Sequence, residues 1–237
     1  MTTQLEILLI TAISVAFLHT LTGPDHYLPF IIMGKARNWS YARTLWLTVI
    51  CGIGHVGSSI VLGIIGIAMG LGLHYLKLFE SSRGNIAAWA IIAFGLIYFT
   101  YGMMKAYRKK PHKHFHYHED GSVHEHEHIH YNEHTHVHQK EGKPNLTPWI
   151  LFLVFVLGPC EPLIPLLMYP AAKNSYFGLV IVATTFSIIT IATMTIIVYL
   201  GLKGFQLISI KPVERYVHAL AGAAIALCGF AILYLGL

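Results

Sequence analysis

Six apolar stretches of this chain are each long enough to cross a lipid bilayer. They cover residues 5–33, 44–72, 86–105, 148–170, 176–202 and 216–236, and about 20 apolar residues span the hydrocarbon core of a membrane. Only 11% of the residues are charged, against about 25% in an ordinary globular domain. We therefore predict an all-α polytopic membrane protein with six transmembrane helices.

The distribution of basic residues predicts how these helices are oriented. Thirteen of the sixteen Lys and Arg residues lie near residues 34–43, 105–147 and 203–215, on one side of the predicted bundle. Basic loops stay in the cytoplasm, so we expect both termini outside and the plasma membrane as the location. The formal charge of +5 then reflects membrane topology, and we expect no nucleic-acid partner.

The membrane part contains an internal sequence repeat. Residues 23–26 read Gly-Pro-Asp-His and residues 158–161 read Gly-Pro-Cys-Glu, and the same offset of 135 residues aligns Ser40 with Ser175. We predict a first three-helix repeat at 1–107, a cytosolic His-rich loop at 108–147 and a second three-helix repeat at 148–237. Because three is an odd number, the two repeats must have opposite orientations, as in the 3+3 inverted repeats of many secondary transporters.

The first helix of each repeat should be broken at its Gly-Pro pair. Proline removes a backbone donor and clashes with the preceding turn, and broken helices at membrane depth are tolerated where they line a cavity. Two interrupted helices at matching positions are the best sequence indication of a transporter binding site. A mere packing kink is the alternative, but Asp25, His26 and Glu161 beside the breaks favour a site.

Counting along the helices places four ionisable residues near the middle of the membrane: His19, His26, His55 and Glu161. Such residues are costly in lipid and commonly mark a transport pathway. Imidazole and carboxylate together suit nickel, cobalt or zinc. Asp25 can serve as an oxygen ligand or as an acceptor that orients a ligating imidazole.

Two motifs resemble the nickel and cobalt permease family, which includes urease-accessory membrane proteins and cobalt/nickel efflux proteins. They are residues 19–26, His-Thr-Leu-Thr-Gly-Pro-Asp-His, and residues 54–58, Gly-His-Val-Gly-Ser. The resemblance implies metal ligands at His19, Asp25, His26 and His55. One extra residue separates His19 from Asp25, which turns His19 by about 100° unless the Gly-Pro break absorbs it. Glu161 is a candidate ligand by position alone.

Eleven of the sixteen histidines lie in the cytosolic loop, all at even positions: His112, His114, His116, His118, His124, His126, His128, His130, His134, His136 and His138. A disordered metal-buffering loop is one interpretation. The alternative is a hairpin with a ladder of imidazoles on one face, because side chains alternate along a strand. A three-residue turn at residues 120–122 would pair His118 with His124 and His112 with His130.

The function that we expect is secondary transport of nickel or cobalt, with zinc as a third option and efflux as the favoured direction. No prosthetic group is expected, and the partners are the metal ion and the bilayer. The chain has no Walker-type glycine loop, and its zinc-protease pattern at residues 124–128 lies in alternating low-complexity sequence, so we expect no enzyme. Two alternatives stay open: a membrane thiol-disulfide carrier using Cys160, and a metal-storage or accessory protein that serves nickel-enzyme maturation proteins.

Overall fold

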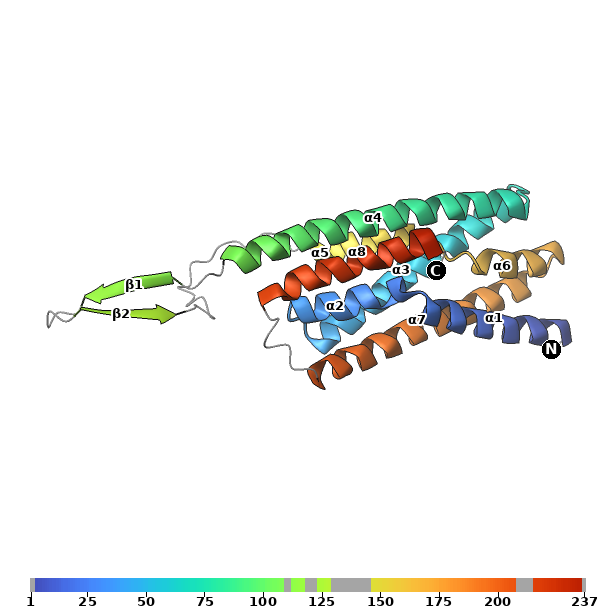
Figure 1. Cartoon of the computed structure of the whole chain (residues 1–237). Coiled ribbons are helices and arrows are strands. Elements are labelled where there is room, and N and C mark those ends of the chain that lie inside the picture. Colours follow the sequence, from blue (N-terminus) through green and yellow to red (C-terminus); the bar gives the residue numbers. More distant parts are fainter. Residues whose placement is uncertain (1–2, 109–111, 118–122, 129–145, 208–214, 236–237) are drawn as a thin grey trace.

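The computed structural model describes residues 3–108, 112–117, 123–128, 146–207 and 215–235. Its membrane part is helical throughout (Figure 1), with elements in the order α1 (Thr3–Thr22), η1 (Pro24–His26), α2 (Leu28–Ala36), α3 (Tyr41–Ala68), α4 (Leu73–Arg108), α5 (Thr147–Leu157), α6 (Leu163–Ala172), α7 (Tyr176–Leu207) and α8 (Val217–Leu235). Two short strands, β1 (His112–Tyr117) and β2 (Val123–His128), follow α4.

Five of the described helices are long and apolar enough to cross a membrane: α1, α3, α4, α7 and α8. Their outer faces carry large apolar side chains, among them Trp46, Ile97 and Leu227, each at least 66% exposed. Exposed apolar surface on this scale is expected where lipid replaces water. The chain is therefore a membrane-embedded helical protein. The apolar helices α5 and α6 have 11 and 10 residues, so each is too short to span a bilayer alone.

The third predicted span is longer than the sequence suggested. Helix α4 begins at Leu73 and has 36 residues, whereas the apolar pattern predicted a start at residue 86. The difference arises because Glu80 and Arg83, which lie outside the predicted apolar span, belong to the helix and form an ion pair with each other. A paired carboxylate and guanidinium can be accommodated within a helical bundle at a lower cost than a single charge.

Both Gly-Pro pairs interrupt a helix where the sequence predicts. Helix α1 ends at Thr22, and a short turn, η1, leads into α2. Helix α5 ends at Leu157, and α6 begins at Leu163. Each interruption leaves backbone groups without helical partners, so other groups of the bundle can bind them.

The turns that end α2 and α6 have the same conformation. Asn38 and Asn174 adopt φ angles of 51° and 52°, a left-handed conformation that asparagine tolerates better than most residues. Ser40 and Ser175 then follow, and their hydroxyls accept bonds from backbone N–H groups three residues later, at 3.2 and 3.1 Å. The local structure thus repeats with an offset of 135 or 136 residues.

Helices α4 and α8 lie side by side with their backbones in close contact (Figure 1). A Cβ atom on Gly102 would collide with the backbone of Ala219, and one on Gly222 would collide with the backbone of Phe99. Small residues at such positions permit the close packing that holds membrane helices together. The apolar core around the bundle centre joins α2, α3, α5 and α7 through Phe30, Cys51, Phe155 and Met194, with further residues nearby.

Strands β1 and β2 form an antiparallel pair, as the hairpin interpretation predicts, but its register differs from the predicted one. The observed pairs are His112 with His128, His114 with His126 and His116 with His124. The predicted pairing of His118 with His124 is therefore wrong by two residues, and the connection is 118–122. A shift of two keeps the six histidines of the strands opposite one another, so parity alone could not distinguish the two registers.

Candidate metal centre

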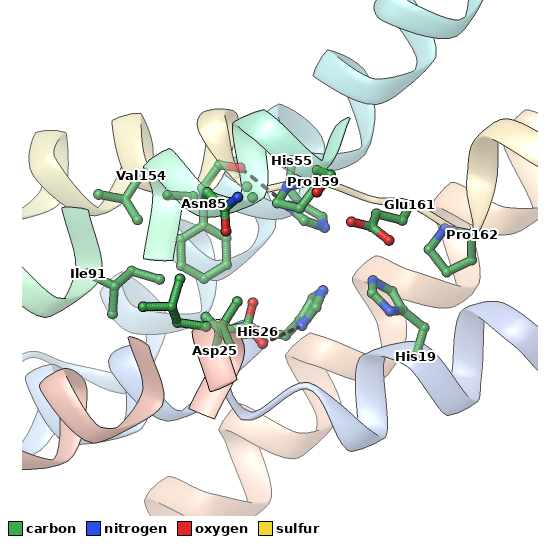
Figure 2. Close-up of a pocket in the computed structure, with 17 residues that line it drawn as sticks. His19, Asp25, His26, His55, Asn85, Ile91, Val154, Pro159, Glu161 and Pro162 are labelled. Atoms are coloured by element: carbon green, nitrogen blue, oxygen red, sulfur yellow. Dashed lines mark hydrogen bonds and ion pairs between the residues drawn. The ribbon is translucent and has the colours of Figure 1, made fainter. Parts of the chain in front are cut away.

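Three histidines from two helical segments and one turn meet in the interior of the bundle. His19 lies on α1, His26 on η1 and His55 on α3. One ligand atom from each lies within 4.8 Å of the others. The ring centre of His26 lies 4.8 Å from the ring centre of His19 and 4.9 Å from that of His55. His26 and His55 are only 2% and 3% exposed. Figure 2 shows the three imidazoles turned toward a common space.

The hydrogen bonds of two of these rings, His26 and His55, use one ring nitrogen and leave the other without a partner. The Nδ1 atom of His26 lies 3.1 Å from both the carbonyl oxygen of Gly23 and the Oδ1 atom of Asp25. The Nδ1 atom of His55 lies 3.3 Å from the carbonyl oxygen of Phe155. Since these neighbours only accept, Nδ1 carries the proton in both rings and Nε2 carries a lone pair.

The Nε2 atoms of His19, His26 and His55 are all buried without a hydrogen-bond partner in the part of the chain that the structure describes. Buried polar atoms are nearly always paired, so an orphaned atom calls for an explanation. Three orphaned imidazole nitrogens in one place are the arrangement expected of metal ligands. Fixing Nδ1 by an acceptor while Nε2 faces the metal is also the usual arrangement of ligating histidines.

The glycine of each Gly-Pro pair lies directly beside one of these rings. A Cβ atom on Gly23 would lie 2.6 Å from the Nδ1 atom of His26, and one on Gly158 would lie 3.2 Å from the Nδ1 atom of His55. A side chain at Gly23 would therefore displace the imidazole of His26. The motif that breaks the helix also makes room for the ligand beside it.

A cavity of about 360 Å³ adjoins the three histidines. Asp25, Asn85 and Glu161 also line it, and Figure 2 shows them around the same space. The site thus offers three nitrogen ligands and an open side, which resembles metal sites that exchange a ligand more than closed structural sites. An ion held there could be reached by water or a further ligand.

A buried polar network fixes the break between α5 and α6. Arg83 on α4 pairs with Glu80, donates to the carbonyl oxygens of Val156 and Gly158 at 3.0 and 3.2 Å, and donates to the Ser58 hydroxyl at 2.8 Å. These carbonyls belong to the last turn of α5 and to the residue that caps it, where helical partners are missing. Arg83 therefore completes the C-terminal end of α5 next to the carbonyl that orients His55.

The same network reaches the start of the next segment. The backbone N–H of Cys160 donates to the Ser59 hydroxyl at 3.1 Å, and the Ser59 hydroxyl lies 3.5 Å from the Oε2 atom of Glu80. Glu80 and Ser59 are both 0% exposed. Helices α3 and α4 thus hold both ends of the interruption.

The sequence predicts some of this site and misses the rest. The structure brings together His19, His26 and His55. Asp25 contacts the Nδ1 atom of His26, and Glu161 lines the cavity but is not part of the histidine cluster.

Glu80, Arg83 and Asn85 are not among the predicted site residues, because they lie outside the apolar span predicted at residues 86–105. The signal that could have found them is the spacing of opposite charges by three residues beside an apolar run, which is typical of an ion pair on one helix.

The loop histidines stand apart from this centre in the sequence. His112, His114, His116, His124, His126 and His128 belong to the two strands. The remaining predicted loop ligands, His118, His130, His134, His136 and His138, lie outside the described residues.

Comparison with known proteins adds no relative. The chain matches no protein-family model, no curated protein and no solved structure. The function must therefore be argued from the site itself.

Proposed function

We propose that the protein is a secondary transporter of divalent transition-metal ions, with nickel or cobalt as the cargo and zinc as a third option. The observation that carries this proposal is the set of three orphaned, buried Nε2 atoms beside a cavity in a membrane-embedded bundle. A structural metal site would be closed by a fourth ligand. An incomplete set of neutral ligands facing a cavity can instead accept an ion and release it.

The proposal includes six membrane spans, with α1–η1–α2 and α5–α6 as broken spans of an inverted 3+3 repeat. The matching turns at Asn38 and Asn174 and the matching caps at Ser40 and Ser175 support the repeat. The packing between the repeats is reciprocal too. Helix α1 of the first repeat packs against α7 of the second, and α5 of the second repeat packs against α3 of the first. Inverted repeats place a substrate site where the broken helices meet.

The direction that we propose is efflux across the plasma membrane, with the hairpin on the cytosolic side. Most of the basic residues lie in the segments 34–43, 105–147 and 203–215, and the second of these contains the hairpin. Basic segments of a membrane protein stay in the cytosol. A chelating segment that collects cytosolic ions supplies an outward path most simply. Imidazole ligands of this kind bind nickel, cobalt and zinc, so the ligands alone do not select one metal.

Metal flux into sealed vesicles tests the proposal. We expect nickel or cobalt uptake into inside-out vesicles containing the protein, and His26→Ala and His55→Ala should each abolish it, because each removes one of the three ligands. His218→Ala is the matched control. This histidine also lies in the bundle, but its Nδ1 atom contacts the Tyr98 hydroxyl and its Nε2 atom contacts the Lys105 ammonium. Normal flux in both ligand variants would refute the proposal.

The same assay separates the alternatives. A thiol-disulfide carrier would lose all activity with Cys160→Ser, whereas metal flux should survive that change. Cys51, Cys160 and Cys228 are all free and buried, and thiol exchange requires sulfur atoms that can meet. A storage or accessory protein would bind nickel but produce no flux.

A further inference from the structure

A second cavity continues from the metal centre toward one end of the bundle. It has a volume of about 430 Å³ and shares Ser81, Glu161 and Pro162 with the first cavity. Its other lining includes His74, on the first turn of α4. The hairpin follows the last turn of α4, so we call that end the hairpin end. The second cavity therefore lies toward the opposite end, the far end, where α3 joins α4 (Figure 1).

Glu161 is the carboxylate at the junction of the two cavities. Its side chain is exposed, and it lines both spaces. Glu80 also lines the second cavity, but it is fully buried and paired with Arg83, so its charge is already compensated. A cation passing from one cavity to the other therefore meets Glu161 as its first carboxylate.

The opposite side of the metal centre is filled by apolar side chains. Phe30 on α2 and Phe155 on α5 have ring centres 4.7 Å apart, and they are 0% and 6% exposed. Both helices lie in the half of the bundle nearer the hairpin (Figure 1). A packed pair of aromatic rings offers no oxygen or nitrogen to replace the water around a divalent ion, so it is a barrier to that ion.

We propose that, in this conformation, the histidine cluster exchanges divalent cations with the far end only, through the second cavity and past Glu161, while Phe30 and Phe155 close the path to the hairpin end. This inference rests on the proposed function. It adds which face of the membrane the site is open to and which residues lie on each side of it. Transport then requires a second conformation in which the aromatic pair separates.

Thiol labelling at adjacent positions tests the path in the full-length protein. Ser81 lines both cavities, whereas its neighbour Ser82 lines neither and bonds to the Leu78 carbonyl. The variants are Ser81→Cys, its matched control Ser82→Cys, and Ser122→Cys, which lies between β1 and β2 and marks the hairpin side. Each is labelled in membranes of both orientations with a charged, membrane-impermeant thiol reagent, and the unaltered chain gives the background of the three native cysteines.

We expect Ser81→Cys to react from the face opposite Ser122→Cys, and Ser82→Cys to react much more slowly. Nickel at ten times its dissociation constant should slow labelling of Ser81→Cys about tenfold, because only the unoccupied fraction reacts. Reaction of Ser81→Cys from the hairpin side, or from neither side, would overturn the path, as would labelling that nickel does not change.

The nickel bound per chain is measured in parallel on the full-length protein and on its His26→Ala variant, so that the difference between them isolates the membrane centre from the hairpin histidines. A nickel ion that His26→Ala removes, together with a failed labelling pattern, would leave the metal centre standing and refute only the path. Equal nickel binding in the two proteins would refute the proposed function itself.

Discussion

The position of the proton on each imidazole ring decides what the central histidines can bind. In His26 and His55 the Nδ1 proton is directed to an acceptor, which leaves the Nε2 lone pair free. A metal ion would use lone pairs that otherwise have no partner in the described structure. An unpaired buried polar atom costs about 1–3 kcal/mol of folding free energy. A metal ion that binds these nitrogens removes that cost, which favours binding.

Asp25 should orient a ligand instead of binding the metal. Its Oδ1 atom lies 3.1 Å from the Nδ1 atom of His26, so Asp25→Asn removes a charged acceptor but leaves all three imidazoles. We expect nickel affinity to fall about 10–100-fold, as it does for other residues that support a ligand. Isothermal titration of the purified protein lacking residues 112–138 measures this, because the histidines of that segment can also bind nickel. A complete loss of binding with Asp25→Asn would instead identify the carboxylate as a ligand.

At the scale of the helices, the interruption between α5 and α6 depends on Arg83. Arg83→Gln leaves Glu80 buried without its partner and frees the carbonyls of Val156 and Gly158. Removing one member of a buried ion pair costs about 3–5 kcal/mol, so the unfolding temperature in detergent should fall markedly. Lys77→Gln, on the same helix but exposed, is the control and should change it little. An unchanged unfolding temperature in Arg83→Gln would show that the network does not hold the break.

The contact between α4 and α8 makes a second prediction for the helices. Gly222→Leu places a side chain against the backbone of Phe99, so the two helices must separate and the folded protein should be lost from detergent extracts. Gly204→Leu is the matched control, because a Cβ atom there meets nothing within 4 Å. Size-exclusion chromatography compares the two. Equal yields of monodisperse protein would contradict the packing described here.

Some of these elements could be predicted from the sequence and others could not. The breaks after Thr22 and Leu157 follow from proline chemistry, and the cluster of His19, His26 and His55 follows from counting depth along apolar helices. The register of the hairpin could not be predicted, because a shift of two residues preserves the histidine pairs. The role of Arg83 was hidden for another reason: its acceptors lie 73 and 75 residues away in the chain, and only tertiary structure brings them together.

At the scale of the whole molecule, fourteen of the sixteen histidines fall into two groups that metal-binding experiments would mix. The strands and their flanking residues carry most of them, and the membrane centre holds three. Deleting residues 112–138 removes the first group and leaves the helices intact in sequence. We expect this deletion to change the apparent affinity or rate of transport only modestly, because the path through the bundle is retained.

X-ray absorption spectroscopy of the nickel-loaded deletion variant tests the central claim most directly, because it counts the imidazoles around the metal. The account predicts one nickel ion per chain with three imidazole ligands, and His26→Ala in the same background should lose the ion. Nickel bound without imidazole, or no nickel bound once the hairpin histidines are removed, would contradict it.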